Sequence, residues 1–110
     1  MDVTVSALGP EAVLVAVTGA VDLYSAARLR SRLDDAITQG HIRLVVDLDS
    51  VDVLDSTGLG VLVARLKAVR QRQGWLRLVC TRDKILRVFD ITGLDQVFVI
   101  ADSVEDALSR

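Results

Sequence analysis

Hydrophobic and polar residues along this chain follow two different periods. Short runs rich in Val, Ile and Leu are typical of β-strands. These runs predict strands at residues 2–8, 12–18, 44–48, 76–80 and 97–100. Elsewhere, apolar residues recur every three or four positions, which is typical of amphipathic helices. They predict helices over 26–39, from Leu59 to Gly74, over 83–92, and after Ser103.

The order of these elements predicts an α/β fold. The first two strands are separated only by a short turn at Gly9-Pro10, so they must be antiparallel. Later strands alternate with helices, which implies right-handed parallel crossovers. We therefore expect a mostly parallel mixed sheet of about five strands, with the antiparallel first strand at or near one edge. Four helices would pack on this sheet, and residues 1–110 would form a single domain.

Composition narrows the classes of function. The chain has 110 residues, of which 51% are hydrophobic, and a net charge of −2, so direct nucleic-acid binding is not expected. One cysteine and one histidine leave no disulfide framework or multi-cysteine metal site, and no cofactor is expected. The start of the chain lacks the features of a signal peptide, and the longest apolar run, Ala12 to Val17, is too short to span a membrane. We expect a cytoplasmic protein without a membrane partner.

Most of the candidate chemistry lies between Asp47 and Gly60, where we expect a loop after the 44–48 strand. This stretch has four carboxylates, three hydroxyls and two glycines. Functional residues in parallel sheets gather at the carboxyl ends of the strands. Three interpretations are open: magnesium-dependent phosphoryl chemistry, simple helix capping, and a phosphorylatable serine.

The first interpretation makes the protein a small magnesium-dependent phosphatase using Asp47 and Asp49. Asp47-Leu48-Asp49-Ser50-Val51 resembles the haloacid dehalogenase signature, but that signature belongs on a first strand and needs a distant lysine and an acidic pair. In the second interpretation, Ser56 or Thr57 caps the following helix, as Ser25 would cap the one before it. Capping explains one hydroxyl, but it leaves the preceding aspartate and the two costly glycines unexplained.

The third interpretation is a switch. A serine at a helix N-terminus is exposed, and free backbone N–H groups tolerate a phosphate there. Phosphorylation would then change the surface charge while the fold survives.

Three segments carry a resemblance to a known family. Asp55-Ser56-Thr57-Gly58-Leu59-Gly60 resembles the phosphoacceptor motif of the STAS family, and of its bacterial anti-sigma factor antagonists in particular. Gly19-Ala20-Val21-Asp22 and the segment 88–94 resemble two further parts of that family's pattern, in the same order and spacing. Together they span about residues 13–100. Ala20 departs from the pattern, because the family commonly has Glu there.

The resemblance implies a regulator rather than an enzyme. Its unphosphorylated form would bind an anti-sigma factor that is also a serine kinase, and so free a sigma factor. Phosphorylation of Ser56 would end the binding until a serine phosphatase restores it. The implied partner-binding residues are Asp22, Asp55, Ser56, Thr57, Gly58 and Leu59. A related alternative is a STAS subunit of a larger sensory or scaffolding assembly.

Two other groups of residues have simpler explanations. Cys80 ends an apolar strand and is expected to be a buried, inert thiol. Arg65, Lys67, Arg70 and Arg72 give the second helix a basic side. A solvated face is the usual explanation, although part of it could meet an acidic partner surface.

Overall fold

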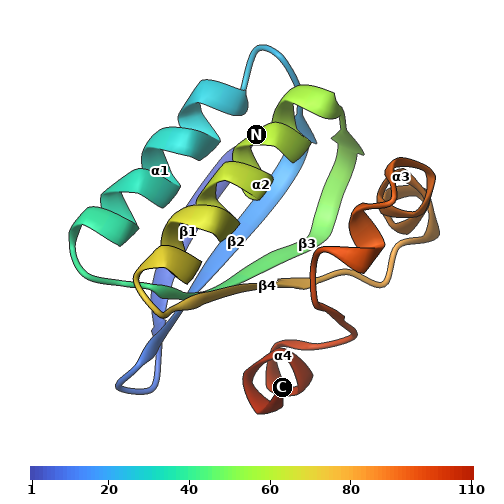
Figure 1. The fold of residues 1–110 in the computed structure, drawn as a ribbon. Helices are drawn as coiled ribbons and strands as arrows, with labels where there is room; N and C mark the ends of the chain where they lie inside the picture. Colours follow the sequence, from blue (N-terminus) through green and yellow to red (C-terminus); the bar gives the residue numbers. More distant parts are fainter.

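The computed structural model describes all residues from 1 to 110 and consists of a five-stranded sheet with helices on both faces (Figure 1). The strands are β1 (Asp2–Leu8), β2 (Ala12–Val21), β3 (Arg43–Leu54), β4 (Trp75–Val79) and β5 (Ile100–Ala101). The helices are α1 (Ala26–Thr38), α2 (Ser56–Gln71), α3 (Asp83–Thr92) and α4 (Val104–Ser109), with a 3-10 turn, η1 (Leu94–Gln96), after α3.

The sheet topology confirms the predicted α/β architecture. The strands lie in the order β1-β2-β3-β4-β5. β1 is antiparallel to β2 at one edge, and every other neighbouring pair is parallel. The carboxyl ends of β2 and β3 therefore lie side by side at one end of the sheet.

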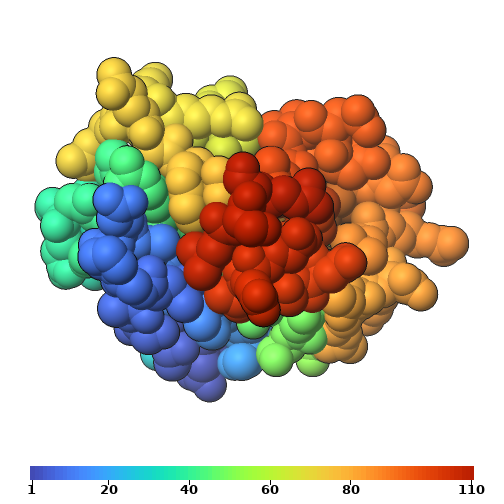
Figure 2. All heavy atoms as spheres, turned by 90° about the horizontal axis from the view of Figure 1, so that it is seen from below, coloured from blue at the N-terminus to red at the C-terminus, as the bar shows by residue number.

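The core has two parts, one on each face of the sheet. α1 and α2 cover one face, where side chains such as Val15, Val46 and Leu78 are completely buried. On the other face, a small cluster joins Val45 to Ala107 of α4. Figure 2 shows this second face, with the red C-terminal residues over its centre and the blue N-terminal strands beside them. No helix combines the length and the apolar character that crossing a bilayer would require.

The strand predicted at 44–48 is longer than expected. β3 continues to Leu54, and β2 continues to Val21, with which Leu54 pairs. The pairing of β2 with β3 has two register shifts and continues past the polar residues 49, 50 and 52 of β3. Val51 and Leu54 still belong to the core. Most of the predicted loop is therefore strand, and the connection to α2 is Asp55 alone.

The strand predicted at 97–100 was largely wrong. Only Ile100 and Ala101 have strand geometry beside β4, although the carbonyl of Val99 still accepts the N–H of Leu78 at 2.9 Å. Val97 to Val99 form an irregular segment after η1. Phe98 is buried edge-on against the ring of Phe89, with 5.7 Å between the ring centroids. Phe98 thus packs onto α3 without strand geometry, while Val97 and Val99 on either side of it are exposed.

Candidate functional site

Two chain segments meet at the carboxyl end of the sheet. One is the loop of residues 22–25 between β2 and α1, and the other is the direct passage from β3 into α2 at Asp55 (Figure 1). The backbone N–H of Asp55 donates to the carbonyl of Val21 at 3.1 Å, which continues the sheet pairing up to the start of the helix. The first turn of α2 is therefore placed directly beside the loop.

The Asp55 carboxylate connects these two segments. Its Oδ1 accepts the backbone N–H groups of Thr57 at 3.0 Å and Gly58 at 3.1 Å, which makes Asp55 the N-cap of α2. Its Oδ2 accepts the N–H of Leu23 at 3.2 Å. The interpretation that Ser56 or Thr57 caps this helix was therefore wrong, because the residue before them does so.

Ser56 and Thr57 are both exposed at the start of α2. Two N–H groups of this first turn are already occupied by Asp55. Fewer N–H groups than expected are therefore free to receive a phosphate on Ser56.

The glycine-rich turn shapes the helix start. A Cβ on Gly58 would lie 2.6 Å from Cγ1 of Val21 and 2.9 Å from Cδ1 of Leu54, so only glycine lets α2 approach β2 so closely. The side chain of Leu59 is 4% exposed and belongs to the core. A Cβ on Gly60 would meet nothing within 4 Å. Gly58 and Leu59 thus position the exposed residues beside them and offer little surface themselves.

Asp22 organises the loop between β2 and α1. Its Oδ1 accepts the N–H groups of Tyr24 at 3.0 Å and Ser25 at 3.2 Å. The hydroxyl of Ser25 donates to the carbonyl of Ala20 at 2.8 Å and makes no capping bond to α1, so the predicted Ser25 cap was wrong. Asp22 is half-buried, and its carboxylate holds the loop that it begins.

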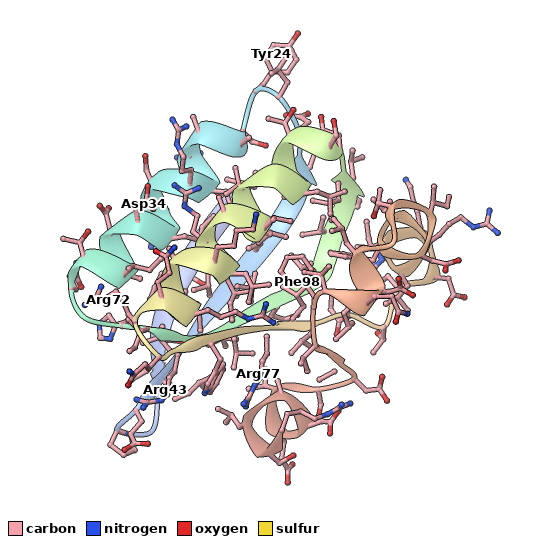
Figure 3. All side chains as sticks on the ribbon, in the orientation of Figure 1. Tyr24, Asp34, Arg43, Arg72, Arg77 and Phe98 are labelled. Carbon is pink, nitrogen blue, oxygen red and sulfur yellow. The ribbon has the colours of Figure 1, made fainter.

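This loop presents two large apolar side chains that our sequence reasoning missed. Leu23 is 68% exposed and Tyr24 is 93% exposed. Figure 3 shows Tyr24 pointing away from the body of the molecule, above the N-terminal ends of α1 and α2. The signal in the sequence was a pair of large apolar residues that fit neither the strand period before them nor the helix period after them. Exposed pairs of this kind are typical of binding surfaces.

A shallow groove of about 420 Å³ runs along α2 from the candidate phosphoacceptor. Its sides come from α2 and from the end of α3 with η1, and its lining is mainly apolar. The lining residues are Ser56, Leu59, Gly60, Val63, Ala64, Lys67, Thr92 and Leu94. Ser56 therefore stands at one end of an apolar groove, with the cationic Lys67 farther along it.

The arginines on the basic side of α2 are engaged within the chain. Arg65 forms a two-pronged ion pair with Asp34 of α1, which is labelled in Figure 3, at 2.9 Å and 3.1 Å. Arg72 donates to the carbonyl of Ile37 at 2.8 Å, and Arg70 to that of Val97 at 3.5 Å. Lys67 is exposed and remains available to a partner.

The other candidate carboxylates lie within or at the end of the sheet pairing. Asp47 pairs with Ala16 on one side and Val79 on the other, and its Oδ1 accepts the N–H of Asp49 at 3.0 Å. Asp49 accepts the N–H and the hydroxyl of Thr81. Both carboxylates thus have structural partners, and no group of three or more His, Cys, Asp or Glu side chains is arranged to hold a metal ion.

Cys80 is buried as expected. It is 1% exposed, and burial raises the pKa of its thiol.

Comparison with known proteins gives a consistent result. Residues 6–107 match the family model described as "STAS domain". The anti-sigma-B factor antagonist of Bacillus subtilis is 40% identical over 91 residues, which cover 83% of each chain. The crystal structure of an anti-sigma factor antagonist from Mycobacterium paratuberculosis superimposes with a TM-score of 0.89 at 27% identity, covering 98% of this chain and 91% of that one. The Bacillus cell fate determinant SpoIIAA, in its phosphorylated form, shares the fold with a TM-score of 0.75 at 22% identity, covering 99% and 98%.

Proposed function

Because the chain belongs to the STAS family and its relatives are anti-sigma factor antagonists, we propose that it binds an anti-sigma factor with serine-kinase activity. In this proposal the unphosphorylated chain holds the kinase and so frees a sigma factor. Phosphorylation of Ser56 releases the kinase, and a serine phosphatase reverses the modification. The observation that carries the proposal is the exposed Ser56 in the first turn of α2, beside a loop held by Asp55.

The proposed docking surface, which we call the Ser56 rim, consists of Leu23, Tyr24, Ser56, Thr57 and the groove along α2. Binding energy at interfaces concentrates in a few large side chains with apolar surroundings. Leu23 and Tyr24 supply such side chains, and the groove can accept apolar side chains from the partner. Asp22 and Asp55 act on this surface by fixing its backbone, because their carboxylates accept backbone N–H groups of the loop and of the helix start.

The charge of a phosphate is sufficient for a switch. A phosphoserine carries about −1.5 to −2 charges at neutral pH. Two negative charges about 6 Å from one carboxylate are repelled by about 1.4 kcal/mol in bulk water, and by about 5.5 kcal/mol at an effective dielectric constant of 20. Each 1.4 kcal/mol or so corresponds to a tenfold change in affinity. The Asp55 carboxylate, which already accepts two N–H groups of the helix start, adds a further negative charge next to the phosphate.

The decisive experiment is incubation of the chain with the anti-sigma factor kinase of the same organism, magnesium and ATP. We expect one phosphate per chain, mapped to Ser56 by mass spectrometry of peptides. Ser56→Ala should abolish incorporation, and Thr57→Val should leave it intact. Phosphate on Thr57, or none on either residue, contradicts the proposal.

A parallel assay tests the remaining enzymatic alternative. If Asp47 and Asp49 formed a phosphatase centre, the chain would hydrolyse an aryl phosphate in the presence of magnesium, and Asp47→Asn would stop it. We expect no hydrolysis above the uncatalysed rate.

A further inference from the structure

The edge of the sheet formed by β1 lacks the usual protection against pairing with another chain. Exposed edges are commonly blocked by Lys, Pro, bulges, very short strands or covering elements. β1 has one charged residue, Asp2, at its start, and its seven residues pair with β2 without a register break. The other edge of the sheet is protected, because β5 has only two residues. In Figure 2 the blue N-terminal strands lie beside the teal residues of α1 and reach the margin of the molecule below them.

Charged side chains of α1 flank this edge near its middle. A hollow of about 150 Å³ separates Val5 of β1 from the side of α1 that carries Arg32 and Asp35. Val5 is 36% exposed, and both charged residues are exposed. The two ion pairs of the structure involve other residues, so Arg32 and Asp35 have no charged partner within the chain.

The positions of these charges along the edge follow from the direction of α1. Arg28, near the start of α1, donates to the carbonyl of Met1 at 3.3 Å. His41, just after α1, lines a second hollow together with Ala7. α1 and β1 therefore run in the same direction, and Arg32 lies closer to the start of β1 than Asp35 does.

We infer that β1 is a homodimerisation edge, at which two copies of this chain pair antiparallel about a twofold axis close to Val5. The axis exchanges the two ends of the edge, so Arg32 of each copy comes opposite Asp35 of the other. An interface with twofold symmetry must be complementary to itself, and this arrangement of opposite charges meets that condition. The two five-stranded sheets would join through backbone hydrogen bonds into one continuous sheet.

The dimer should dissociate on dilution. Stable interfaces bury about 1,600 Å² in total, and two seven-residue strands with one flanking helix side each contribute less. We expect sedimentation velocity to show the mass of one chain near 5 µM and to approach two chains near 500 µM, which corresponds to a dissociation constant of about 50 µM.

Charge exchange tests the geometry with exposed residues that the fold does not need. Arg32→Glu should raise the dissociation constant about tenfold by placing like charges opposite each other, and R32E/D35R should restore it to within about threefold. Arg30→Glu is the matched control. Arg30 is also exposed on α1, but about 200° around the helix from Arg32, on the side of Asp34 and α2. R30E should dimerise like the unmodified chain.

Amide hydrogen exchange locates the contact. Protection of residues 2–8 should rise with protein concentration, and V5K, which places a charge on the edge, should remove that rise. A one-chain mass at every concentration, failure of R32E/D35R to restore the dimer, or association without protection of β1 would each overturn the inference. S56D should dimerise normally, so this test is independent of the proposed phosphorylation.

Discussion

The carboxylate of Asp55 accepts the backbone N–H of Leu23 at 3.2 Å, across 32 positions of the sequence. With its other oxygen it caps the helix that begins at Ser56. One side chain therefore sets the position of the candidate phosphoacceptor relative to the loop that exposes Leu23 and Tyr24. A partner that contacts both segments would therefore depend on the hydrogen bonds of the Asp55 side chain.

Removal of the Asp55 carboxylate should therefore affect both stability and loop order. Asp55→Ala removes the cap of α2 and the acceptor for Leu23, and we expect it to lower the free energy of unfolding by about 1–2 kcal/mol. Asp55→Asn keeps a side-chain oxygen at the cap and should cost less than half as much. Urea denaturation measures both, and faster amide exchange at Leu23 in D55A would identify the broken contact. Equal stability of D55A and the unmodified chain would contradict this role.

Substitutions of Ser56 should separate binding from folding. Ser56→Asp places a carboxylate at the Ser56 rim, and we expect its affinity for the kinase to fall more than tenfold, since about 1.4 kcal/mol of repulsion is enough. Ser56→Ala should bind within about threefold of the unmodified chain. Calorimetric titration gives the affinities, and thermal melting should show little difference because Ser56 is exposed. Equal affinities of S56D and S56A would reject the electrostatic switch.

The two glycines of α2 should respond in opposite ways to the same change. Gly58→Ala forces a Cβ against Val21 and Leu54, and we expect a loss of about 1–3 kcal/mol in the free energy of unfolding. Gly60→Ala meets open space, so the helix propensity of alanine should raise stability by up to about 1 kcal/mol. Denaturation of the pair tests the close approach of α2 to β2. Because Gly60 also lines the groove, weaker kinase binding by G60A would show that the partner occupies that groove.

The exposed loop residues should matter for binding alone. Leu23→Ala and Tyr24→Ala should each weaken kinase binding about tenfold or more, with changes in the free energy of unfolding below about 0.5 kcal/mol. Leu108→Ala is a matched control, since Leu108 is 41% exposed on α4, which packs on the opposite face of the sheet. If all three variants bind alike, the loop is not part of the docking surface.

Cys80 should make stability fall in alkaline solution. Burial raises the pKa of this thiol in the folded chain above its unfolded value, so the folded state keeps the proton longer. The contribution of the protonated thiol to the free energy of unfolding is fully present below the unfolded pKa of about 8.5. This contribution is lost as the pH rises through the pKa of the folded chain. Cys80→Ala should flatten this part of the stability profile measured by urea denaturation. A thiol reagent should also react much faster with unfolded chain than with folded chain at neutral pH.

Local patterns in the sequence were enough to predict the sheet and most of its helices. Val13, Val15 and Val17 alternate into the core as a strand should, and Gly93 adopts the left-handed conformation that ends α3. Such features depend on neighbours within one or two turns of chain, so they can be recognised in the sequence itself. The motif around Ser56 is local in the same sense, and it is enough to indicate the family.

Tertiary structure decided the contacts between distant segments. Residues 97–99 have strand composition, but Phe98 packs on Phe89 and the segment lacks regular strand geometry until Ile100. Asp55 caps α2 because β3 continues to Leu54 and so places Asp55 at the start of the helix. The same position brings the Asp55 carboxylate beside Leu23. A hydrogen bond between residues 32 positions apart depends on where the strands end and where the register between β2 and β3 shifts. No local periodicity in the sequence encodes these features. The sequence by itself therefore determined the elements and the candidate serine, while the folded chain determined which side chains surround that serine.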